Sequence, residues 1–157
     1  MERNLEKLEK ELDVSFNNKN ILKNALVHRS YLNEHKNFKI ENNERLEFLG
    51  DAVLELIVTD YLYHNYKDPE GILTNWRSSL VNAVSLSKIS KKLKIYEYLY
   101  LSKGESKDNN EKAKNYILSN ALEAIIGAIY LDQGYKITEK FIKNNLIINL
   151  KKIIKDK

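Results

Sequence analysis

The chain has 157 residues, of which 43% are hydrophobic and 31% charged, enough for one folded domain with one core. The absence of cysteine excludes disulfides, thiolate metal sites and cysteine nucleophiles, and it fits a reducing, cytoplasmic location. The net charge of +4 and the pI of about 9.0 favour polyanionic partners only mildly.

The N-terminal residues are charged and contain no apolar stretch, so they do not resemble a signal peptide. No apolar run along the chain is long enough to cross a bilayer. We therefore expect no membrane partner.

A single proline and five glycines in a chain of this length favour helices. No turn-bounded alternation of apolar and polar residues indicates a strand. We predict an all-α fold with about seven helices, and Gly134 is expected to end one of them as a C-cap. In chain order, helices are predicted over residues 4–13, 21–31, 44–66, 73–93 (as one helix or two), 116–131 and 137–154, with polar connections over 33–43 and 102–115.

Acidic residues share one face of the predicted helix over residues 44–66. On a helical wheel, Glu44, Glu47, Asp51 and Glu55 lie close together, and like charges at this spacing repel. A bound cation would relieve that repulsion, although an ordinary surface helix also carries an acidic stripe opposite an apolar one. The apolar residues predicted to face the core are Leu46, Leu49, Val53, Leu56 and Ile57.

The helix over residues 116–131 has a similar design. Asn120 and Glu123 lie on its polar face, and Gly127 on the same face would permit another helix or a ligand to approach closely. If the two polar faces oppose each other, Glu47, Asp51, Asn120 and Glu123 would form a cluster of oxygen ligands suited to Mg²⁺ or Mn²⁺. The opposite side of this helix carries Leu118, Leu122, Ile125 and Ile129.

Phe48 lies on the acidic side of its helix, where a solvated face does not ordinarily place a large aromatic side chain. An interface with another chain would explain its position.

Residues 43–54, Asn-Glu-Arg-Leu-Glu-Phe-Leu-Gly-Asp-Ala-Val-Leu, resemble the signature motif of the ribonuclease III family. Other segments resemble further family segments in the same order along the chain. They are residues 25–31 (Ala-Leu-Val-His-Arg-Ser-Tyr), 70–71, 77–82, 101–105 and the second catalytic segment, 117–132.

The resemblance implies a homodimeric, all-α endonuclease domain over residues 1–157 that cleaves double-stranded RNA with Mg²⁺, or Mn²⁺ as a substitute. It implies 5′ phosphates and short 3′ overhangs as products, and processing of ribosomal and other RNA precursors as the role. By position, Asp51 and Glu123 match catalytic residues that are also metal ligands. The remaining matches are Glu47 and Asn120 with metal ligands, Glu44 and Glu70 with residues that line the site, and Phe48 with a dimer-interface residue.

Asn120 departs from the family pattern, which has aspartate at this position. An amide oxygen can bind a hard cation but brings no negative charge, so we expect weaker metal binding and residual activity. Bacterial members also carry a C-terminal double-stranded-RNA-binding domain, which we do not expect within this chain.

Two other functions remain open from the sequence. One is a nuclease-like domain that binds structured RNA without cutting it, which Asn120 favours. The other is an all-α metal-dependent phosphohydrolase, which the scattered histidines do not support. His28 is predicted to be a packed or hydrogen-bonding residue, because no nucleophile accompanies it.

Overall fold

The computed structural model describes residues 3–156, and within them the fold is all-α, as predicted. The only β-type backbone pairing among these residues is an isolated bridge between Val27 and Tyr100. The α-helices are α1 (Leu5–Leu12), α2 (Lys19–Ala25), α3 (Arg29–Glu34), α4 (Glu44–Asn65), α5 (Glu70–Val81), α6 (Ala83–Lys92), α7 (Lys103–Lys107), α8 (Glu111–Gln133), α9 (Tyr135–Asn145) and α10 (Leu150–Lys155), with 3₁₀ turns η1 (Ile95–Tyr98) and η2 (Ile147–Asn149).

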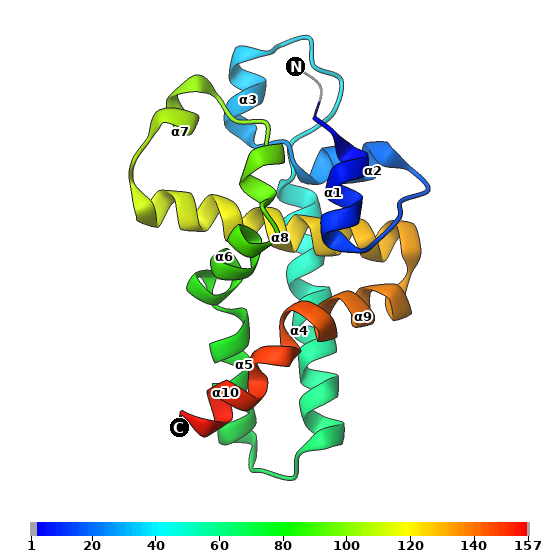
Figure 1. Cartoon of the computed structure of the whole chain (residues 1–157), viewed down its shortest axis with the longest axis vertical. Coiled ribbons are helices and arrows are strands. Elements are labelled where there is room, and N and C mark those ends of the chain that lie inside the picture. The colour runs from blue at the N-terminus through cyan, green and yellow to red at the C-terminus, as the bar shows by residue number, and fades with distance from the viewer. Residues whose placement is uncertain (1–2, 157) are drawn as a thin grey trace.

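The arrangement is built around the two longest helices (Figure 1). Helix α4 runs along the long axis of the molecule, and α8 lies across it in the upper half. Helices α1, α2, α3 and α7 form the upper end, whereas the α4–α5 hairpin and α10 form the lower end. The candidate site residues predicted on α4 and on α8 can therefore meet only where these two helices cross.

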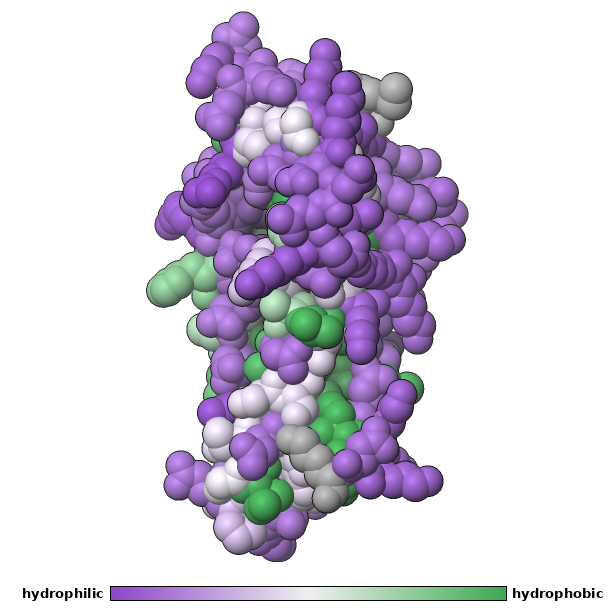
Figure 2. All heavy atoms as spheres, turned by 90° about the vertical axis from the view of Figure 1, so that its left-hand side faces the viewer, coloured by the Kyte–Doolittle hydropathy of each residue, from purple (hydrophilic) through white to green (hydrophobic). Residues whose placement is uncertain are grey.

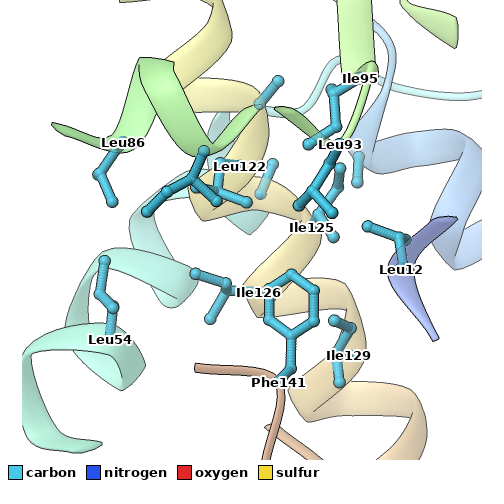
Figure 3. Close-up of a cluster of buried hydrophobic side chains, with 14 of the residues drawn as sticks. Leu12, Leu54, Leu86, Leu93, Ile95, Leu122, Ile125, Ile126, Ile129 and Phe141 are labelled. Carbon is cyan, nitrogen blue, oxygen red and sulfur yellow. The ribbon is translucent and has the colours of Figure 1, made fainter. Parts of the chain in front are cut away.

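The core lies where α8 is enclosed by its neighbours. Leu122, Ile125 and Ile126 of α8 are fully buried against side chains of several other helices (Figure 3). The predicted core face of this helix is confirmed, since Leu118 and Ile129 are also inaccessible to solvent. Burial of this kind stabilises the fold by about 25 cal/mol per Å² of apolar surface removed from water.

The prediction for the core face of α4 is wrong at one residue. Leu46, Val53 and Ile57 are buried, but Leu56 is 57% exposed. Leu56 lies at the edge of the predicted apolar arc, on the side nearer Phe48, and the helices packed on α4 do not cover that edge.

The predicted helix over residues 21–31 is in fact two helices, α2 and α3. The backbone between them pairs with a distant segment: the Tyr100 amide donates to the Leu26 carbonyl at 2.9 Å, and the His28 amide donates to the Tyr100 carbonyl at 3.0 Å. Apolar periodicity cannot reveal this break, because the competing hydrogen bonds come from a segment more than seventy residues away.

The segment over residues 102–115, predicted to be a connection, contains α7 and the first turn of α8. Both helices begin at side-chain caps: Ser102 Oγ accepts from the Glu105 amide at 3.1 Å, and Asn110 Oδ1 accepts from the Ala113 amide at 3.1 Å. Such caps stabilise helix starts without any apolar periodicity, so the prediction from periodicity was wrong here.

The C-terminal prediction of one helix over residues 137–154 is also wrong, because α9, η2 and α10 follow one another with changes of direction. The 3₁₀ turn η2 places Leu150 in the core, and α10 packs against α5. Residues 73–93 form two helices that divide at Asn82, whose side chain caps α6. Gly134 ends α8 at a φ of 83°, which confirms its role as a C-cap.

Exposed apolar surface is not spread evenly. The face in Figure 2, which is the left-hand side of Figure 1, is almost entirely hydrophilic in its upper half and carries apolar patches in its lower half. Among the described residues, no helix combines the length and the hydropathy needed to cross a membrane.

Candidate active site

Gly50 and Gly127 allow α4 and α8 to cross with their backbones in contact. A β-carbon at Gly50 would lie 1.7 Å from the Glu123 carbonyl oxygen, and one at Gly127 would lie 2.4 Å from the Leu46 carbonyl oxygen. No larger residue fits at either position unless the backbones move apart. The prediction that Gly127 permits a close approach is confirmed, and the partner is α4. The crossing brings Asp51, which follows Gly50, beside Glu123.

A cleft of about 780 Å³ opens beside this crossing. It contains most of the residues predicted from the sequence, since Glu44, Glu47 and Asp51 line it from α4, and Asn120 and Glu123 line it from α8. The opposing polar faces expected from the helical wheels therefore do meet. The remaining lining residues are His28, Arg29, Asn43, Phe48, Glu105, Ala113, Tyr116 and Ile117.

The carboxyl groups of Asp51 and Glu123 are close enough to share a proton. Burial, a hydrogen bond to Asp51 and the negative charges of Asp51, Glu47 and Glu55 together raise the pKa of Glu123 to about 9. Burial and the charges of Glu44 and Asp51 also raise the pKa of Glu47. Without a cation, Glu123 is therefore protonated at neutral pH and donates to Asp51, which relieves part of the repulsion that the sequence predicted.

Glu55, the fourth acid of the α4 stripe, takes no part in the cleft. Its carboxylate accepts from Arg77 Nε of α5 at 3.1 Å, and the same guanidinium donates to Thr59 at 2.9 Å. Glu55 is thus neutralised by a neighbouring helix, which the wheel of α4 alone cannot show.

The donor set of the cleft fits a hard divalent cation. Within residues 3–156, no three His, Cys, Asp or Glu side chains are gathered into a ready-made metal cage. Mg²⁺, however, usually binds through one or two carboxylates and completes its octahedron with water and substrate phosphate. The Asp51–Glu123 pair, with Glu47 and the amide of Asn120 in the same cleft, supplies oxygen ligands of that kind.

Two predicted site residues lie at the margin of this arrangement or outside it. Phe48 stands at the edge of the cleft with 82% of its surface exposed. Glu70 is the first residue of α5, at the far end of α4, where it lines a separate groove with Tyr63 and Arg77. The crossing therefore does not bring Glu70 together with the acidic residues of the same chain.

The sequence did not identify His28, Arg29, Glu105 and Tyr116 as cleft residues. His28 and Arg29 lie at the start of α3, Glu105 in α7 and Tyr116 near the start of α8. Residues 28, 29 and 116 fall within helices predicted from apolar periodicity, and residue 105 within the predicted connection, so none of them was predicted to face a cleft. His28 does act as a hydrogen-bonding residue, as predicted, because its Nδ1 caps α3 by accepting from the Ser30 amide at 3.2 Å. Burial lowers the pKa of His28.

The match of the chain to known proteins agrees with this geometry. Residues 18–150 match the family model described as Ribonuclease-III-like. A Campylobacter jejuni protein named ribonuclease 3 is 45% identical over 160 residues, covering 98% of this chain and 68% of the relative. An Oceanobacillus iheyensis protein of the same name is 48% identical over 129 residues, which cover 82% of this chain and 56% of that relative.

A solved nuclease domain of ribonuclease III from C. jejuni superposes with a TM-score of 0.77 at 44% identity, covering 90% of this chain and 98% of the domain. That structure is described as showing structural flexibility in a region involved in dimer formation. Family model, relatives and fold all agree, and the chain belongs to the ribonuclease III family. The fold is that of the family's nuclease domain, and the chain is an endonuclease of the ribonuclease III class.

Proposed function

We propose that this chain cleaves double-stranded RNA by metal-dependent hydrolysis of phosphodiester bonds, leaving 5′ phosphates and short 3′ overhangs. The observation that carries the proposal is the pairing of Asp51 with Glu123 across the α4–α8 crossing, in an open cleft beside Glu47 and Asn120. The nearness of the two carboxyls raises the pKa of Glu123, and neither side chain fills the core. A bound cation would stabilise both groups as carboxylates, which gives this pairing a functional explanation.

Glu47, Asp51, Asn120 and Glu123 would hold Mg²⁺, or Mn²⁺ in its place. When bound, the metal would polarise the scissile phosphate and lower the pKa of a water nucleophile. The residues of the chain fix the ligand positions, because at the Gly50–Gly127 crossing the backbones of α4 and α8 pack directly against each other. A duplex would be distinguished from a single strand by its A-form shape and its 2′-hydroxyls.

We propose further that the chain works as a homodimer through one face of α4. Phe48, Leu56 and Tyr63 lie on this face with 82%, 57% and 70% of their surfaces exposed. Ala52 and Thr59, also exposed, lie between them. Exposed large apolar side chains that follow one another along a single helix face favour burial against another protein surface. The dimer-forming region described for the C. jejuni nuclease domain supports a second copy as the partner.

The test of cleavage is a titration of Mg²⁺ and of Mn²⁺ with labelled duplex RNA, with single-stranded RNA of the same sequence as the control. We expect the duplex to be cut and the single strand to remain intact. The Asp51→Asn variant should lose cleavage while it keeps its helical content, since Asp51 is exposed and carries no core contact. Cleavage without any divalent cation, or equal cleavage of both RNAs, would contradict the proposal.

Asn120 supports a second candidate, a domain that binds structured RNA without cutting it. The amide removes one negative charge from the cleft that the family pattern places there. Under this alternative, the protein would shift duplex RNA in a gel but cleave it at no metal concentration. Roles in ribosomal RNA processing and a cytoplasmic location stay predictions from the sequence.

A further inference from the structure

The charges that line the cleft are strongly one-sided. Five carboxyl groups face it, from Glu44, Glu47, Asp51, Glu105 and Glu123. Arg29 is the one lysine or arginine among the described residues that line the cleft. An RNA strand carries a negatively charged phosphate at every nucleotide. A metal at Asp51 and Glu123 could neutralise one of these phosphates, but the neighbouring phosphates of the same strand would still face the carboxyl groups. A further cationic contact is needed to hold such a strand against these carboxyls.

Arg29 is placed to make that contact. Its guanidinium lies 3.8 Å from Glu44 Oε1, near the outer limit of an ion pair, and 74% of its side chain is exposed. The guanidinium therefore lies at the cleft beside Glu44 and keeps most of its five N–H donors available. A guanidinium fork also matches two oxygens of one phosphate.

His28, the neighbouring residue, has a fixed orientation. Its Nδ1 accepts from the Ser30 amide at 3.2 Å, and it lies 2.7 Å from Ser30 Oγ. That hydroxyl accepts from the Ser102 amide at 3.0 Å, and because Nδ1 already accepts from the Ser30 amide, the hydroxyl donates its own proton to Nδ1. With Nδ1 used as an acceptor, the neutral ring carries its proton on Nε2. Since these contacts use Nδ1, the Nε2–H group stays available to a ligand in the cleft that His28 lines.

We propose that Arg29 and the Nε2–H group of His28 together bind one phosphate of the RNA strand, adjacent to the phosphate held at Asp51 and Glu123. This contact sets the position of the strand along the cleft. The inference rests on the proposed function, since it assumes that RNA is the substrate, but it assigns a role to residues outside the carboxylate set.

The test compares Arg29→Ala with the wild-type protein in steady-state cleavage of duplex RNA at saturating Mg²⁺ over a series of salt concentrations. We expect KM to rise about ten- to hundredfold, the scale of a lost hydrogen bond to a charged group, with little change in kcat. The slope of log(kcat/KM) against log salt should become shallower by about 1, because one phosphate contact is lost.

Lys143→Ala is the matched control. Lys143 lies 3.7 Å from Glu139 in a similar exposed ion pair on α9, away from the cleft, so this variant loses the same charge. Its KM and salt slope should equal those of the wild type. Arg29→Lys should restore the salt slope but only part of the KM, because lysine keeps the charge and loses the fork.

His28→Asn separates the cap from the phosphate contact. Asparagine can accept from the Ser30 amide and so preserve the start of α3, but it lacks the Nε2–H donor. We expect a raised KM with an unchanged melting temperature. Wild-type KM and salt slope in Arg29→Ala, or the same loss in Lys143→Ala, would overturn this inference while leaving the proposed function intact. Failure of the wild-type protein to bind or cut duplex RNA would instead overturn the proposed function.

Discussion

Replacing Gly50 with alanine is expected to force α4 and α8 apart at their crossing. The new β-carbon would lie 1.7 Å from the Glu123 carbonyl oxygen and 2.9 Å from the Gly127 amide nitrogen, where ordinary contacts are 3.4 Å or more. Both opposing atoms belong to the backbone of α8, so no change of rotamer can relieve the clash. The helices must separate by more than an ångström where their packing is tightest.

The cost of this separation follows from the behaviour of overpacked cores. Inserting one carbon typically destabilises a well-packed interior by about 1–3 kcal/mol, and a backbone-to-backbone clash belongs at the upper end of that range. For a domain of this size, about 3 kcal/mol corresponds to a fall in melting temperature of about 10 °C. The cleavage rate should fall even at temperatures where the variant stays folded, because Asp51 and Glu123 flank the clash. Misplacement of reacting groups by about 1 Å can lower a rate about a hundredfold.

The assay is thermal unfolding followed by circular dichroism, paired with duplex cleavage at a temperature where both proteins are folded. Gly71→Ala is the control, since a β-carbon at Gly71, in the first turn of α5, meets no atom within 4 Å. That variant should melt at the wild-type temperature or slightly above it, because alanine favours a helix over glycine. If Gly50→Ala melted and cleaved like Gly71→Ala, the reasoning that this crossing positions the carboxyl pair would be refuted.

Three further predictions concern the charges and the exposed stripe. Asn120→Asp should lower the Mg²⁺ concentration for half-maximal cleavage by about tenfold, because removal of a partner from a metal site typically weakens metal binding by at least that factor and this change restores one. An equal metal requirement in both proteins would show that Asn120 does not face the metal. In the metal-free protein, the pKa of Glu123 is about 9 in the folded state, against an ordinary value of 4.5. The contribution of Glu123 to the free energy of unfolding is therefore greatest below pH 4.5 and is lost as the pH rises from 4.5 toward 9. Melting temperatures across this range should fall for the wild type and stay flatter for Glu123→Gln; parallel curves would contradict the assignment. Phe48→Ala should weaken dimerisation by about tenfold or more in sedimentation velocity, whereas Ile148→Ala, which also loses an exposed apolar side chain, should not.

Much of the candidate site was predictable, because periodicity reports which residues share a face of one helix. The acidic arc of α4 and the polar face of α8 followed from spacing alone, and Asp51 and Glu123 do meet. Spacing could not show that Glu55 is neutralised by Arg77, since that guanidinium belongs to another helix. Nor could it show that Leu56 is uncovered, since exposure at the edge of an arc depends on what packs against it.

The sequence by itself determined the fold class, the two long helices and the acidic residues on them, because these depend on local propensity and on the 3.6-residue period. The tertiary structure decided the rest. It divided the helices at residues 26–28 through hydrogen bonds with Tyr100. It also brought Arg29 and His28 to the cleft, and it gave Gly50 its role as the reciprocal contact of Gly127. Each of these depends on contacts between distant segments, which no local pattern encodes.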